Sequence, residues 1–151
     1  MRKPLVLNIL AAAGIAASAL AMSAGRYRDP ACVRIPPPSS PVDVDFTAFH
    51  GILRDVKFTA FLRAPGDFRG QRVRLCGVAL QAEDAKGRRH YGVKVFDAAG
   101  CCPLFIVEYL PAGTNAVPEE GAEIVVDGTV HTPGPGAFCP VAVSNAVARP
   151  L

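Results

Sequence analysis

The sequence carries almost no net charge once its first residues are set aside. Arg2 and Lys3 open the chain, and the other 14 Lys and Arg residues are balanced by 13 Asp and Glu residues. A near-neutral domain has no electrostatic attraction for nucleic acid, so we expect no nucleic-acid partner. Of the two remaining basic clusters, the first is expected to be a solvated hairpin turn and the second to be the polar face of a strand. They are Lys86, Arg88 and Arg89, and Arg69, Arg72 and Arg74.

The sequence motifs of common hydrolases and phosphate-binding enzymes are also missing. The chain contains no Gly-x-Ser-x-Gly, no His-Glu-x-x-His and no phosphate-binding glycine loop. His50 lies in a helical pattern and His90 begins a strand, and each is expected to be a surface or internally satisfied histidine. The residues therefore give no case for an enzyme, with thiol–disulfide exchange as the one alternative.

The long apolar run of this chain stands at its start and predicts export. A short basic segment leads into apolar residues 5–24, and Ala19-Leu20-Ala21 fits a small-x-small cleavage pattern. Residues 1–24 are therefore predicted to be a signal peptide or, because residues 5–24 are about long enough to span a bilayer, an uncleaved inner-membrane anchor. In both cases we expect the remaining chain to be periplasmic or otherwise extracytoplasmic. It would contact the membrane only through an uncleaved N-terminal segment.

A proline-rich linker and one folded domain are predicted after this segment. Residues 25–44 form the linker, because Pro36-Pro37-Pro38 favours a stiff polyproline-type conformation. Residues 45–151 form the domain, which begins with a helix that Pro65-Gly66 ends. Its apolar stripe recurs at spacings of three and four residues. The stripe consists of Phe49, Ile52, Leu53, Val56 and Ala60.

Beyond the helix the apolar period changes to two, which predicts five strands. They are expected near residues 73–80, 91–96, 104–110, 124–130 and 141–147. Gly70–Gly77 and Gly121–Gly128 share the form Gly-x-x-apolar-x-apolar-x-Gly, and a glycine inside a strand often marks a bulge or bend. We therefore predict a mainly β fold, a small five-stranded, partly open barrel of the oligonucleotide/oligosaccharide-binding (OB) type with a preceding α-helix. A two-sheet sandwich is the alternative.

An adjacent cysteine pair is the main chemical feature of the domain. The five cysteines are Cys32, Cys76, Cys101, Cys102 and Cys139. A bond between Cys101 and Cys102 would be strained, because adjacent Cα atoms lie about 3.8 Å apart and disulfides begin at about 4.4 Å. Pro103 favours an extended Cys102, so the two sulfurs are expected to point to opposite faces.

Four interpretations of these cysteines stay open. One is a disulfide from Cys101 or Cys102 to Cys139, which lies in a proline-flanked turn. Another is a zinc or copper(I) site drawn from Cys101, Cys102, Cys139 and His131, although the adjacent pair lacks the usual zinc-ligand spacing. The third is a redox-active vicinal disulfide. The fourth is a set of buried, inert thiols, with Cys76 foremost.

Four segments, in order, carry a family resemblance. They are Val42–Thr47, Ala64–Gln71, Val95–Cys102 and Glu123–Thr129. Over about residues 42–147 the chain resembles a family of small exported bacterial proteins, often lipoproteins, of unassigned function. That family is similar in turn to the soluble C-terminal domain of a family described as two-component permeases. Its most specific motif is Asp-Ala-x-x-Cys-Cys.

The resemblance implies an OB-type barrel, a shared site at Cys101 and Cys102, and an association with transition-metal handling. This chain departs from the family pattern in lacking the lipid-attachment cysteine and in having Cys76. We therefore expect an exported accessory or binding domain that handles zinc through the cysteine-pair loop. The alternative is a disulfide-stapled envelope interaction module without metal or catalysis. In either case the expected partner is an envelope or membrane transport protein.

Overall fold

The computed structural model describes residues 35–97, 99–100, 102–113, 117–134, 137 and 139–151. The predicted signal peptide or anchor, residues 25–34 of the predicted linker, Cys32 and Cys101 lie outside the described residues. Within the described part of the chain, no helix is long and apolar enough to cross a membrane.

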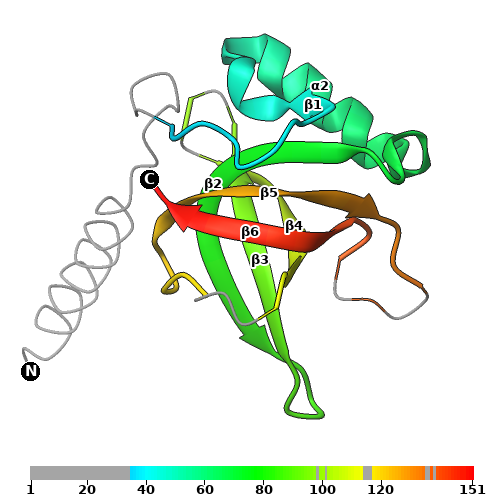
Figure 1. Cartoon of the computed structure of the whole chain (residues 1–151), viewed down its shortest axis with the longest axis vertical. Coiled ribbons are helices and arrows are strands. Elements are labelled where there is room, and N and C mark those ends of the chain that lie inside the picture. Colours follow the sequence, from blue (N-terminus) through cyan, green and yellow to red (C-terminus); the bar gives the residue numbers. More distant parts are fainter. Residues whose placement is uncertain (1–34, 98, 101, 114–116, 135–136, 138) are drawn as a thin grey trace, which may run out of the picture.

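The described residues form a mainly β structure with one α-helix, as the sequence predicts (Figure 1). The strands are β1 (Val44–Asp45), β2 (Arg72–Glu83), β3 (Arg89–Phe96), β4 (Pro103–Pro111), β5 (Glu123–His131) and β6 (Ala142–Pro150). The helix α2 (Gly51–Arg63) lies between two short 3-10 helices, η2 (Phe46–Ala48) and η3 (Pro65–Phe68). All five predicted strands are confirmed. The additional strand β1 has two residues, too few for an alternating pattern to be visible.

The six strands belong to one mixed sheet in the order β1-β2-β3-β4-β6-β5, and β5 also pairs with β2. The β1–β2 and β4–β6 pairs are parallel, and the other pairs are antiparallel. β2 serves two partners in turn: residues 72–78 pair with β5 and residues 78–83 pair with β3. The long β2 strand therefore connects two parts of the sheet.

Gly77 and Gly128 lie where strand pairing changes. Gly77 directly precedes Val78, the residue at which the strand paired with β2 changes from β5 to β3. A Cβ atom at Gly77 would lie 2.3 Å from the carbonyl oxygen of Lys94. The register between β5 and β6 shifts between Asp127 and Thr129, and a Cβ at Gly128 would lie 2.4 Å from Val143 Cγ1. The glycines that the sequence singled out therefore permit close approach of neighbouring strands.

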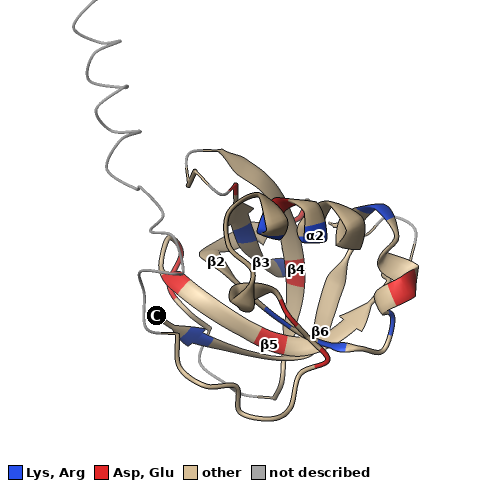
Figure 2. Ribbon diagram, turned by 90° about the horizontal axis from the view of Figure 1, so that it is seen from above, with Lys and Arg blue, Asp and Glu red and all other residues tan. Residues whose placement is uncertain are grey.

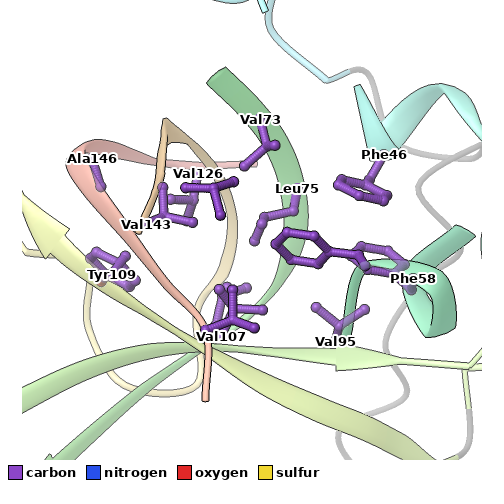
Figure 3. Close-up of a cluster of buried hydrophobic side chains, with 14 of the residues drawn as sticks. Phe46, Phe58, Val73, Leu75, Val95, Val107, Tyr109, Val126, Val143 and Ala146 are labelled. Atoms are coloured by element: carbon purple, nitrogen blue, oxygen red, sulfur yellow. The ribbon is translucent and has the colours of Figure 1, made fainter. Parts of the chain in front are cut away.

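The core consists of side chains from one face of the sheet and aromatic rings from η2 and α2 (Figure 3). Alternate residues of each strand point into it, as the period of two requires. They include Val73, Leu75, Val93, Val95, Val107, Tyr109, Ile124 and Val126. Phe46 stacks on Phe58 with ring centroids 4.4 Å apart, so the helix is joined to the sheet by aromatic packing.

The apolar stripe that predicts the helix is not the face that α2 buries. Ile52, Leu53 and Val56 are 80%, 50% and 58% exposed, whereas Phe58 and Phe61 are buried together with Arg54. Both faces of this helix carry apolar residues, so periodicity alone does not select between them. The aromatic side is the one that packs, because it offers more apolar area to the sheet.

The described part of the predicted linker is docked onto the sheet. Arg74 donates a hydrogen bond to the carbonyl oxygen of Pro36, and Arg149 Nη1 donates to that of Pro37 at 3.1 Å. Asp127, which is 0% exposed, lies 2.5 Å from Arg149 Nη2 and 3.5 Å from Arg74 Nε. Arg74 alternates with the core residues Val73 and Leu75 on the polar face of β2, as expected, but it is buried. An internal aspartate and a peptide carbonyl replace its water.

Candidate functional site

Cys102 ends a tight loop between β3 and β4, which we call the cysteine loop. The amide of Asp97 donates to the carbonyl of Cys102 at 2.9 Å, and the amide of Cys102 donates to Asp97 Oδ1 at 3.3 Å. Gly100 has a φ of +67°, which a glycine adopts without strain, and its amide donates to Asp97 O. Cys102 is exposed at the end of the loop, and Cys101 lies outside the described residues.

A buried arginine of α2 binds the backbone where β3 ends and this loop begins. Arg54 Nη2 donates to the carbonyl oxygens of Phe96 and Asp97, at 3.2 Å and 2.6 Å. Arg54 is only 3% exposed, and its charge is stabilised by these carbonyl dipoles. This role is not evident from the sequence, because an arginine within a helix is ordinarily solvated.

Cys139 lies in the wall of a pocket that also reaches the end of the cysteine loop. The pocket has a volume of about 510 Å³. It is lined by Leu62, Lys94, Pro103, Phe105, Ile106, Cys139 and Pro140. Pro103 follows Cys102 directly, so the fold brings the cysteine loop and Cys139 to the same pocket. Within the described residues, no disulfide joins Cys102 to Cys139.

The Cys139 thiol is held in its neutral form. Burial raises its pKa, and the nearby Glu108 carboxylate raises it further, while a hydrogen bond from the Glu108 backbone amide acts in the opposite direction. Cys139 is 6% exposed. A thiol with a raised pKa must lose its proton at greater cost before it acts as a nucleophile or a metal ligand.

A chain of titratable side chains continues from Glu108 to the β2–β3 turn. His90 Nδ1 lies 2.7 Å from Glu108 Oε1, and His90 Nε2 lies 3.5 Å from Asp84 Oδ2. The hydrogen bond with Glu108 raises the pKa of His90, although burial acts against this shift. Hydrogen bonds from Arg88, first of all from its backbone amide, hold the pKa of Asp84 well below its usual range.

The prediction that His90 is an internally satisfied histidine is confirmed by these two contacts. Glu108 was not singled out from the sequence. The available signal was a carboxylate inside the apolar run Leu104–Leu110, where a buried glutamate requires a partner. The sequence does not identify that partner, because His90 belongs to a different strand.

His131 is not among the described residues that line the pocket. It ends β5, is exposed, and pairs with Ala142 of β6. Among the described residues, no three His, Cys, Asp or Glu side chains are grouped so that they could hold a metal ion. Of the candidate metal ligands that the structure describes, Cys139 lines the pocket and Cys102 directly precedes the lining residue Pro103.

Both acidic and basic residues are scattered over the described ribbon (Figure 2). Comparisons with known proteins give no family assignment, because no family model, curated protein or solved structure matches the chain.

Proposed function

We propose that this chain is an exported binding domain whose ligand site is the pocket beside the cysteine loop. We further propose that one cysteine of the pair, Cys101 or Cys102, forms a disulfide with Cys139. One observation carries the proposal: Cys139 and Pro103, the neighbour of Cys102, line the same pocket. A disulfide at this position would staple the segment that carries Cys139 to the start of β4. In a small domain such a staple typically contributes about 2–4 kcal/mol.

The pairing of the strands supports an OB-type barrel as the framework of this site. β2 pairs with β3 and β5, and the parallel β4–β6 pair connects the remaining edges. In barrels of that type the second and third strands and the adjoining loops contact the ligand. The corresponding strands here are β3 and β4, which supply Lys94, Phe105 and Ile106 to the pocket.

Two features of the pocket favour the disulfide over a zinc site. Lys94 contributes a positive charge to the lining, which repels a cation. Zinc also requires cysteine thiolates, and the environment of Cys139 favours the neutral thiol. A disulfide removes this cost, because its sulfur atoms carry no charge.

Export, expected from residues 1–24, would place this site in the cell envelope, where disulfides persist. The resemblance to small exported proteins suggests an envelope or membrane transport protein as the partner. Such a partner would meet the domain at the exposed cysteine loop.

Peptide mapping of exported protein under non-reducing conditions tests the proposal. The expected result is a Cys139 peptide linked to the peptide that contains Cys101 and Cys102. Cys139→Ser should abolish this species, whereas the matched variant Cys76→Ser, at a buried position on β2, should retain it. Complete alkylation of Cys139 in native, exported protein would exclude the disulfide. Zinc retained in stoichiometric amount under reducing conditions and lost in Cys102→Ser would favour the metal site instead.

A further inference from the structure

We infer that the pocket binds an amphipathic monoanion, a molecule with one carboxylate and an apolar tail. The inference rests on the proposed function only in using the same pocket as the ligand site. It names the chemical class of the ligand, and it does not require the disulfide.

Most of the described residues that line the pocket are apolar. Leu62 comes from α2, Phe105 and Ile106 come from β4, and Pro140 comes from the segment before β6. A volume of about 510 Å³ lies within the range of about 300–1,000 Å³ that is typical of small-molecule sites. An apolar tail placed here would remove from water both its own apolar surface and that of the pocket, which favours binding.

Lys94 is the one charged side chain among the described residues that line the pocket. It is half-buried on β3 opposite Ile106, and none of the ion pairs among the described residues involves it. Glu108, two residues beyond Ile106 on β4, is already bound to His90 at 2.7 Å. The Lys94 ammonium is therefore available to a ligand, and an apolar surrounding strengthens its attraction for an anion.

The charge pattern also limits the ligand to one negative charge. A single ammonium compensates one carboxylate, and the Glu108 carboxylate near Cys139 repels a second anionic group. The carboxylate would thus contact Lys94, and the tail would extend over Ile106 and Phe105 toward Leu62. The neutral Cys139 thiol forms part of the apolar wall in this arrangement.

Calorimetric titration of the full chain with three ten-carbon probes tests the inference. Decanoate, decylamine and decanol share a tail and differ in the charge of the head group. We expect decanoate to bind about tenfold or more tightly than decylamine, because a hydrogen bond to a charged group contributes about 1.5–3 kcal/mol. Lys94→Met should remove this preference and Lys94→Arg should retain it. Lys86→Met, in the β2–β3 turn, is the matched control and should bind decanoate as the unaltered chain does.

Alkylation of Cys139 in the reduced protein provides a second measurement. Bound decanoate should slow the reaction of Cys139 with iodoacetamide and leave that of Cys102 unchanged, because Cys139 lines the pocket and Cys102 does not. Equal affinity for decanoate and decylamine, no binding of decanoate, or an unchanged rate at Cys139 would each overturn the inference. Binding of decanoate to exported protein in which non-reducing peptide mapping finds no Cys139 disulfide would overturn only the proposed staple. A mapped disulfide without decanoate binding would overturn only the ligand class.

Discussion

At the scale of single residues, the site is governed by one carboxylate that influences two neighbours in different ways. Glu108 is 7% exposed, accepts a hydrogen bond from His90, and lies beside the Cys139 thiol. Its negative charge favours the protonated form of both groups. The hydrogen bond with Glu108 raises the pKa of His90. For Cys139, burial is the larger cause of the raised pKa and the Glu108 carboxylate adds to it.

Replacing Glu108 by Gln should lower the pKa of His90, because the hydrogen bond with this carboxylate is the largest cause of the upward shift. An NMR titration of the His90 ring protons measures it. Since the folded pKa is raised, the stabilisation from His90 is fully present below its unfolded pKa and is lost as pH rises through its folded pKa. Glu108→Gln should reduce this pH dependence of the unfolding free energy, and the contact with Asp84 should retain a smaller part of it. The exposed-site control Glu120→Gln should preserve it, and an unchanged His90 titration in Glu108→Gln would contradict the assignment.

At the scale of elements, α2 shows how a helix with two apolar faces is oriented. Its inner side carries Phe58, Phe61 and the buried Arg54, and its outer side carries Ile52 and Val56. The ring of Phe58 stacks on Phe46 and packs at a tilt against Phe105 of β4, and the ring of Phe61 packs at a tilt against Phe46. The two carbonyl groups of the cysteine loop that Arg54 binds fix the same orientation. Helix rotation and loop position are therefore coupled.

Phe58→Ala should lower the free energy of unfolding by about 3–5 kcal/mol, because it removes a ring that is 1% exposed. Val56→Ala, on the outer face, should change it by less than about 0.5 kcal/mol. Urea denaturation followed by circular dichroism compares the two variants. Similar losses in both would show that the helix is rotated differently from the arrangement described above.

The close approach of β2 and β3 at Gly77 leads to a second prediction at this scale. Gly77→Ala would place a Cβ against a backbone carbonyl 2.3 Å away, and we expect a loss of about 1–3 kcal/mol or more. Gly66→Ala is the matched control, because a Cβ at Gly66 would meet nothing within 4 Å. Thermal unfolding of the two variants measures the difference. A Gly77→Ala protein as stable as the control would contradict the close approach of β2 and β3.

At the scale of the whole molecule, the proline-rich segment is part of the folded domain. Pro36 and Pro37 are bound by two arginines that Asp127 holds together, and Asp43 is bound to β2 through its amide and its carboxylate. From Pro36 onward, the predicted linker of residues 25–44 is therefore bound to the sheet.

Asp127→Asn should lower the free energy of unfolding by about 3–5 kcal/mol, because it leaves the buried Arg74 without its counter-charge. The matched control Asp67→Asn, at an exposed position in η3, should have little effect. Chemical denaturation provides the measurement. A small loss at Asp127 would show that the hydrogen bond to Pro36 alone suffices for Arg74.

The sequence by itself determined the positions of the strands, the helix and the strand glycines, because these depend on local periodicity and on backbone freedom. It also drew attention to Cys139 and to the loop that ends at Cys102. Only the tertiary structure decided that Arg54 and Arg74 are buried, that Cys139 and Pro103 line one pocket, and that Lys94 lines it too. These features depend on which distant segments become neighbours, and packing and hydrogen bonding between such segments are not encoded in the spacing of residues along one strand or helix.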